Sequence, residues 1–195
     1  MPLILAEGSH VGLYVILGIV FLVFIWVIGT YNGLVRLRQH CRESWSGIDT
    51  ELRRRYDLIP NLVETVKGYA AHERAVLQAV IEARSRAVAS TGSAASQAKD
   101  ENVLIGALRQ LFAVVERYPD LKASANFLQL QEELVNTEDR IQAARRFYNA
   151  NVRDINTRVE VFPSNMIARM FGFVQEEFFE IEDAGIRAPV RVGLV

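Results

Sequence analysis

The side chains that most often carry out chemistry are few in this chain and scattered. The histidines and the one cysteine are His10, His40, His72 and Cys41. His40 and Cys41 are adjacent, so on a helix their side chains point about 100° apart, which does not suit a nucleophile paired with its base. Paired carboxylates such as Glu132 and Glu133 are also neighbours in sequence and do not converge on one substrate atom within a single helix.

Motifs that bind metals or phosphates are missing from the sequence. It contains no His-Glu-x-x-His, no Cys-x-x-Cys and no glycine-rich phosphate loop. We therefore predict no catalytic, cofactor-binding or metal-binding residues, and a protein that is not an enzyme. The 22 basic and 23 acidic residues nearly cancel, which argues against nucleic acid as a partner.

A polar helix face is the first candidate for an interaction surface. Asp57, Asn61, Glu64 and Lys67 fall on one side of a predicted helix. Further polar residues stud a second predicted helix: Asn126, Gln129, Glu133, Arg140, Asn149 and Asn156. Two interpretations stay open, a docking surface for a partner and hydrogen bonds between helices that fix their register.

A short apolar helix is the second candidate. Ser164 is expected to cap it and Gly172 to end it. The side chains that it is expected to expose are Met166, Ile167, Met170 and Phe171. This helix either caps the end of a bundle or lies in the interface of a membrane.

An uncharged apolar run, Val11 to Ile28, must position everything that follows it. Its length suits a hydrocarbon core of about 30 Å, which predicts a transmembrane helix over residues 11–30. A cleaved signal peptide is disfavoured because residues 1–10 contain no Lys or Arg and no Ala-x-Ala site follows the run. The chain is thus expected to bind membrane lipid through residues 11–30.

The charges that flank this run predict its orientation. Glu7 is the only charged side chain before it, whereas Arg36, Arg38 and Arg42 follow it closely. The positive-inside bias places residues 1–10 outside the cytoplasm and the C-terminal domain inside it, as a single-pass protein.

Apolar residues recur at steps of three and four after the apolar run, which predicts one long helix to about Ala89 with a kink near Pro60. The stripe consists of Leu34, Leu37, Cys41, Trp45, Ile48, Leu52, Tyr56, Ile59, Val63, Val66, Ala70, Leu77, Ile81 and Val88. Whether the transmembrane helix runs directly into it or a flexible linker at residues 29–33 intervenes stays open.

Two more long helices are predicted beyond a small, polar turn at residues 90–99. The first is capped by Asp100 and ends at Tyr118. The second runs from about Leu121 to Phe162, with apolar residues every seventh position: Phe127, Leu134, Ile141, Tyr148, Ile155 and Phe162. This repeat predicts a seam either within an intramolecular bundle or in an intermolecular coiled coil.

The predicted fold is all-α: an N-terminal transmembrane helix, then an antiparallel bundle of three long helices plus a short C-terminal helix. The bundle is expected over residues 31–173. Residues 174–195 are expected to form an acidic C-terminal tail whose last part is loose.

Three segments together resemble the LemA family of bacterial membrane proteins. They are RRYDLIPNLVETVKGYAAHE at 54–73, YPDLKASANFLQLQEEL at 118–134, and RRFYNANVRDINTRVEVFPSNMIARMFGF at 145–173. The resemblance covers almost the whole chain, and it departs from the family pattern at Phe147 and in the acidic C-terminal stretch. It implies an anchor with its N-terminus outside and an antiparallel bundle, but no settled activity. Family members accompany HtpX-type metalloproteases or resemble a magnetosome protein.

The expected function is that of a membrane-anchored, non-enzymatic scaffold or adaptor in the bacterial inner (cell) membrane. It would self-assemble into a homo-oligomer and organise partners at the cytoplasmic face, with an HtpX-type metalloprotease among the candidate partners. The alternative is membrane remodelling or the biogenesis of an intracellular, magnetosome-type membrane compartment.

Overall fold

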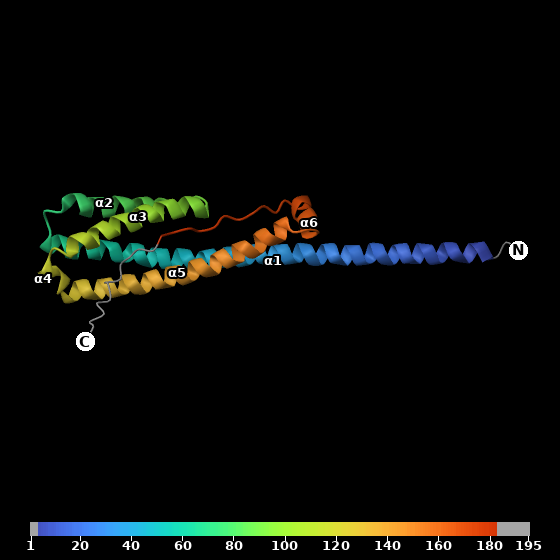
Figure 1. The fold of residues 1–195 in the computed structure, drawn as a ribbon, viewed down its shortest axis with the longest axis horizontal. Helices are drawn as coiled ribbons and strands as arrows, with labels where there is room; N and C mark the ends of the chain where they lie inside the picture. The colour runs from blue at the N-terminus through green and yellow to red at the C-terminus, as the bar shows by residue number, and fades with distance from the viewer. Residues whose placement is uncertain (1–3, 183–195) are drawn as a thin grey trace, which may run out of the picture. The chain divides into compact units, whose positions relative to one another are not determined.

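The computed structural model of the chain describes residues 4–182, and side chains from Val11 onward. This part of the chain is α-helical and contains no β-strand (Figure 1). The helices are α1 (Ile4–Tyr69), α2 (Arg74–Ala89), α3 (Ala94–Val115), α4 (Pro119–Lys122), α5 (Ala125–Glu160) and α6 (Ser164–Met170). The chain divides into two compact units, Met1–Cys41 with Asn151–Glu176, and Arg42–Ala150 with Glu177–Val195.

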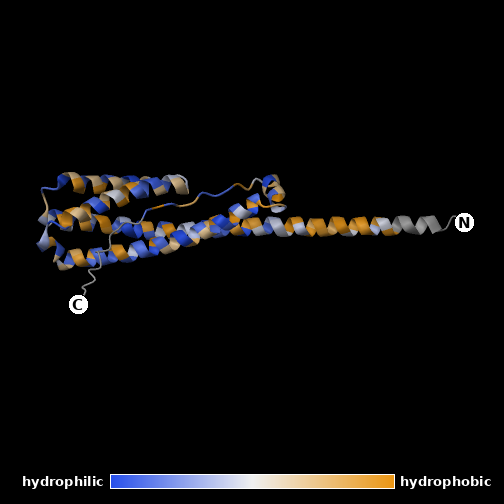
Figure 2. Cartoon of the chain, viewed as in Figure 1, coloured by the Kyte–Doolittle hydropathy of each residue, from blue (hydrophilic) through white to orange (hydrophobic). Residues whose placement is uncertain are grey.

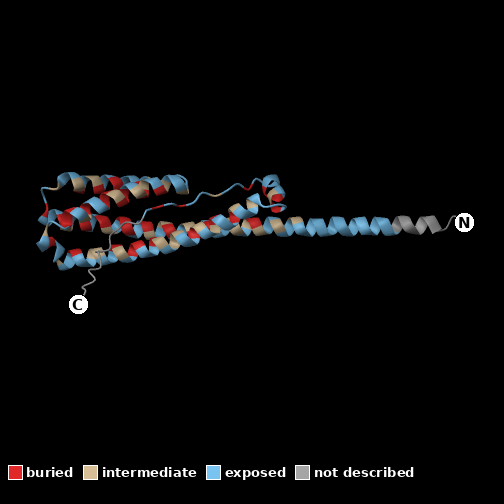
Figure 3. Ribbon diagram, viewed as in Figure 1, coloured by how far each residue is buried: buried red, intermediate tan, exposed pale blue. Residues whose placement is uncertain are grey.

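Residues 11–28 of α1 carry no charge and are mostly hydrophobic (Figure 2), and α1 is exposed from Val11 to Trp26 (Figure 3). Within the described residues, α1 is the one helix long and apolar enough to cross a membrane. Its most apolar stretch is not buried against any other part of the protein. An exposed apolar helix of this length is stable when lipid, rather than water, surrounds it.

α1 continues from this stretch to Tyr69 with no break at Gly29 or Gly33. The continuous helix is therefore confirmed, and the flexible linker is not formed. Pro60 lies inside α1, as predicted, and is exposed.

The predicted continuation of this helix to Ala89 is wrong. Residues 70–73 form a turn, where Arg117 donates a 2.7 Å hydrogen bond to the carboxylate of Glu73. Because α2 restarts the helical phase after this turn, Ile81 and Val88 are 43% and 50% exposed instead of buried. The buried residues of α2 are Leu77, Val80, Ala83 and Ala87.

The second unit is an antiparallel bundle in which the later part of α1, then α2, α3 and the first part of α5 alternate in direction (Figure 1). Its core is aliphatic and aromatic: Ile48, Leu52, Ile59, Leu62 and Val66 of α1, Leu104, Leu108 and Leu111 of α3, and Phe127, Leu134 and Ile141 of α5. The seven-residue repeat of α5 thus packs inside the chain, as the intramolecular seam predicts.

Several helix ends differ from the predicted ones. α3 begins at Ala94, where the Ser93 hydroxyl accepts from the backbone of Ser96, so Asp100 does not cap it. Residues 119–122 form the separate short helix α4, so α5 begins only at Ala125. α5 ends at Glu160, which leaves Phe162, the last member of the repeat, 73% exposed.

The first unit has its own small core around α6. Leu34, Ile167, Ala168 and Phe173 are buried there, with Val27, Val35 and Val159 packed against them. The ring of Tyr31 lies 4.8 Å from that of Phe171. α6 therefore packs against the part of α1 that follows the apolar stretch.

The two ends of α6 are formed differently from each other. Ser164 does not cap the helix, because its hydroxyl donates to the backbone oxygens of Arg158 and Val161 at 2.7 and 2.9 Å. Gly172 ends it as predicted, with a φ of 69° that favours glycine. The Phe173 N–H then bonds back to the Ala168 carbonyl at 2.9 Å, which closes the helix end.

Residues 173–182 form an extended segment, hereafter the strap. This segment is the first part of the predicted acidic tail, and it is packed against the helices, since Phe179 and Ile181 are 0% and 5% exposed. The expected loose end at residues 184–195 lies outside the described residues.

Candidate interaction surfaces

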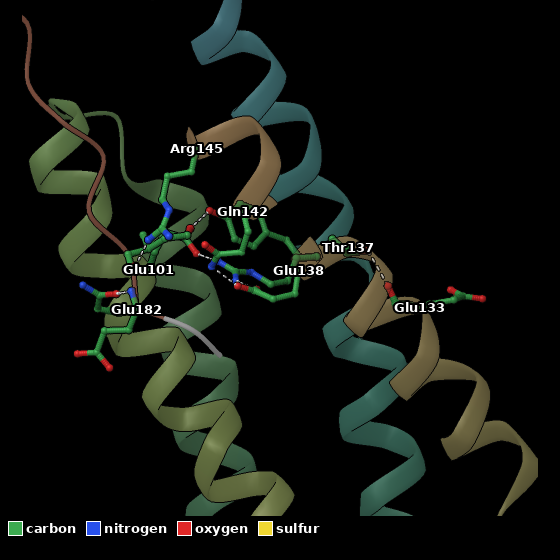
Figure 4. Close-up of polar contacts among 11 residues, drawn as sticks. Glu101, Glu133, Thr137, Glu138, Gln142, Arg145 and Glu182 are labelled. Atoms are coloured by element: carbon green, nitrogen blue, oxygen red, sulfur yellow. Dashed lines mark hydrogen bonds and ion pairs between the residues drawn. The ribbon is translucent and has the colours of Figure 1, made fainter. Parts of the chain in front are cut away.

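A buried ion cluster joins α1, α3 and α5 in the second unit. The guanidinium of Arg55, which is fully buried, contacts the carboxylate of Glu101 and donates to that of Glu138 at 3.0 Å. Gln142 donates to the second oxygen of Glu138 at 2.7 Å. Figure 4 shows Glu101 on α3 facing Glu138 and Gln142 on α5. Each helix supplies one charge, so the cluster fixes the register of three helices together.

The hydroxyl of Tyr56 also contacts the Glu101 carboxylate. Burial and the adjacent Glu101 charge raise the pKa of Tyr56, so the phenol keeps its proton at every physiological pH. The four side chains Arg55, Tyr56, Glu101 and Glu138 are all buried, so the cluster contributes to the stability of the bundle.

A polar groove of about 980 Å³ runs between α1 and α5 in the same unit. It contains two of the predicted residues, Asp57 and Asn61, and faces them with residues of α5. The lining carries both carboxylates and guanidiniums and consists of Asp49, Thr50, Arg53, Arg54, Asp57, Leu58 and Asn61 of α1 with Glu133, Asn136, Thr137 and Arg140 of α5. A lining of both signs suits a protein surface better than a polyanion.

The other two residues of the predicted polar face lie apart from this groove. Lys67 and Glu64 pair with each other at 3.2 Å and are 59% and 70% exposed. A pair this exposed on one helix is worth only about 0.3–0.5 kcal/mol. We therefore restrict the candidate surface on α1 to the groove.

α6 presents an apolar surface on one side only. Met166 and Met170 are 61% and 74% exposed and Phe171 is 48% exposed, whereas Ile167 is buried at 6%. The prediction that Ile167 belongs to the exposed surface is wrong, because its side chain faces Leu34 in the core of the first unit. α6 thus packs against α1 on one side and exposes apolar side chains on the other, while its insertion into a membrane interface stays a prediction.

Asparagine side chains of α5 hold the strap by its backbone. The Asn149 amide accepts from the Phe179 N–H at 2.9 Å and donates to the Phe179 carbonyl at 3.1 Å. Asn156 makes the same pair of bonds with Glu176, at 2.8 and 2.9 Å. Each carboxamide replaces the partner that a neighbouring β-strand would supply.

α3 holds the strap in the same manner. Asn102 accepts from the Glu182 N–H at 2.8 Å and donates to the Glu180 carbonyl at 3.3 Å. The carboxylate of Glu177 accepts from the Ala95 N–H at the start of α3. The hydrogen bonds from Ser93 and from this N–H lower the pKa of Glu177, so its charge supports the docked strap above its ordinary pKa and the support fades as pH falls.

Cys41 is the cysteine of the chain, and its thiol is held in the interior of the first unit. Cys41 is buried, and this burial, with the nearby Glu176 and Asp154 carboxylates, raises the pKa of its thiol to about 11. Among the described residues, no cluster of His, Cys, Asp and Glu has the geometry of a metal site.

Sequence reasoning overlooked Arg55, Glu101 and Glu138. A signal was available, because each of these charged residues lies three or four positions from buried apolar residues on its helix. Charged residues in phase with an apolar stripe are typical of buried ion pairs.

Comparison with known proteins matches residues 44–193 to the LemA family. Magnetosome protein MamQ 2 of Paramagnetospirillum magneticum is 28% identical over 180 residues, which cover 80% of this chain and 66% of that protein. Protein LemA of Metamycoplasma hominis is 28% identical over 175 residues, with coverages of 88% and 78%. The chain therefore spans slightly less than two thirds of the length of the magnetosome relative. With the exposed apolar span, these matches indicate a membrane-associated helical protein.

Replacing the buried guanidinium tests the ion cluster. We expect Arg55→Met to lower the free energy of unfolding by about 3–5 kcal/mol, because two carboxylates are left without their partner. The measurement is urea unfolding of the full chain in detergent, followed by circular dichroism. The control, Arg53→Met, removes a guanidinium that is 74% exposed and should change the stability by less than about 0.5 kcal/mol. Equal losses in both variants would refute the role of the cluster.

The reactivity of Cys41 tests its environment. With a pKa of about 11, the thiol should react with iodoacetamide at pH 7.5 at least roughly a hundredfold more slowly than a free cysteine. Its rate should rise about tenfold for each pH unit up to pH 10, because only the thiolate reacts. A cysteine at the exposed position 39, introduced as Gln39→Cys with Cys41→Ala, supplies the control. Equal rates at pH 7.5 would contradict the expected burial and pKa.

Proposed function

We propose that this chain, which belongs to the LemA family, is a membrane-anchored, non-enzymatic scaffold that assembles with copies of itself. In this proposal the N-terminus lies outside the bacterial inner membrane and the helical bundle lies at the cytoplasmic face. Arg36, Arg38 and Arg42, which follow the apolar span, support that orientation.

The polar groove between α1 and α5 carries the proposal of self-assembly. Its three carboxylates, on Asp49, Asp57 and Glu133, are matched by three guanidiniums, on Arg53, Arg54 and Arg140. A two-fold interface places the same patch on both copies, so a patch that mixes both signs can complement itself. The carboxamides of Asn61 and Asn136 each contain a donor and an acceptor, so they too can pair with the same patch on a second copy.

Other features support a scaffold over an enzyme. The buried ion cluster occupies the polar interior of the bundle without access to a substrate. The Cys41 thiol is held protonated by its burial. An HtpX-type metalloprotease remains the hetero-partner that we propose from the family resemblance.

Cross-linking through the groove tests self-assembly in native membranes. We expect Asn136→Cys, treated with a flexible bismaleimide, to yield a covalent dimer, because position 136 lies in the proposed two-fold interface. Gln78→Cys, at an exposed position of α2, is the control and should stay monomeric. A monomer in both variants, or equal dimer yields, would contradict assembly through the groove. A heavier product specific to Asn136→Cys would point instead to a hetero-partner.

A second candidate function is the shaping of a membrane compartment. The observation in its favour is that relatives named magnetosome protein MamQ match 80% of this chain. Electron microscopy of liposomes that carry the full-length protein distinguishes the two functions. A scaffold leaves the vesicles spherical, whereas a protein that shapes a compartment produces tubules or invaginations at high protein density.

A further inference from the structure

The boundary between hydrocarbon and water along α1 lies just after the apolar run. Residues 11–28 carry no charge, and Arg36 is the first charged side chain beyond them. Trp26 lies near the end of this run and Tyr31 just beyond it, as aromatic residues do at the headgroup level of a bilayer. Side chains and cavities next to residues 29–36 therefore lie at the level of the lipid headgroups.

A cavity of about 730 Å³ opens at this level within the first unit. One wall is α1 from Trp26 to His40, and the other is α5 at Asp154, Thr157 and Arg158. Two residues of the α1 wall, Gly29 and Gly33, have no side chain to fill the cavity. A Cβ atom at either glycine would meet no other heavy atom within 4 Å, so these glycines border open space and do not serve close helix packing.

The charged side chains of this cavity favour an anion. Arg36 and Arg158 come from different helices, are exposed, and form no ion pair with another described residue. Asp154 is the one carboxylate in the lining, so two guanidiniums face one opposing charge. The planar fork of arginine donors matches the oxygens of a phosphate group.

An apolar extension of this cavity favours an anion that carries an acyl chain. A second cavity, of about 270 Å³, shares Trp26, Thr30, Thr157 and Arg158 with the first and continues along Val161, Phe162 and Pro163. Val161 and Phe162 are 51% and 73% exposed, which is costly in water and favourable against acyl chains. Met166 and Met170 of α6, a few residues further along the chain, are also exposed.

We propose that this groove binds an anionic phospholipid, with the phosphodiester between Arg36 and Arg158 and an acyl chain against Trp26, Val161 and Phe162. This site is independent of self-assembly through the polar groove. It would fix the depth of the first unit in the bilayer, because a bound headgroup has a set distance from the hydrocarbon.

The test uses the purified full-length chain in detergent micelles, with lipid retention counted by native mass spectrometry. Phosphatidylglycerol should bind at a lower concentration than phosphatidylcholine. The double variant Arg36→Gln with Arg158→Gln should weaken phosphatidylglycerol binding about tenfold, since each arginine near a lipid surface contributes a several-fold effect. Gly33→Leu should also weaken it, because the new side chain fills the groove.

The matched control is Arg42→Gln with Arg153→Gln, which removes the same charge from the same two helices outside the groove. It should change binding less than twofold, and circular dichroism should show equal helicity in all variants. Equal weakening by both double variants would overturn the proposal, since it would mean non-specific attraction. Displacement of the lipid by an equal concentration of inorganic phosphate would also overturn it, since the site would then take soluble phosphate. Unchanged binding in Gly33→Leu would exclude the groove as the site even if the arginine variant failed to fold.

Discussion

The fully buried guanidinium of Arg55 is the constraint on which the helical bundle depends. A buried cation is tolerated only when it is paired, and the two carboxylates that pair it come from α3 and α5. α1, α3 and α5 must therefore meet at one register. The same register sets the spacing of the two walls of the polar groove, because these walls are other turns of α1 and α5.

The polar residues that the structure describes divide into those bonded within the bundle and those that form exposed pairs at its surface. The first group forms its hydrogen bonds within the chain, and it contains Glu101, Glu138 and the asparagines that bind the strap. The groove side chains instead form weak, exposed pairs, such as Arg53 with Asp49 at 3.0 Å. Surface pairs of this kind contribute little to stability, so breaking them in the proposed self-assembly would cost little.

The periodicity of the sequence predicted most of the helices because burial repeats with the helical turn. The stripe from Leu34 to Ala70 and the repeat from Phe127 to Ile155 follow it. The stripe failed after Ala70, where the helix ends at a turn held by Arg117 and Tyr118, contacts that are distant in sequence. The strap was not predicted either, because its hydrogen-bonding partners are side-chain amides on helices and not a neighbouring strand with its own pattern. Of the candidate surface residues, Asp57 and Asn61 fall in the groove, whereas Ile167 was misplaced because one turn of α6 contains both buried and exposed residues.

The strap is made after the helices that it covers, so the order of synthesis matters for this protein. Its buried ring, Phe179, packs 5.3 Å from Trp45, a residue near the opposite end of the chain. The ribosome makes the apolar span and all the helices first. It makes the strap residues that contact Trp45 and Tyr148 only afterwards. At about 5–20 residues per second, the nascent protein spends seconds already attached to the membrane with this aromatic face uncovered. The strap is the last of the described segments to be made, and until Phe179 packs against it the ring of Trp45 lacks this cover.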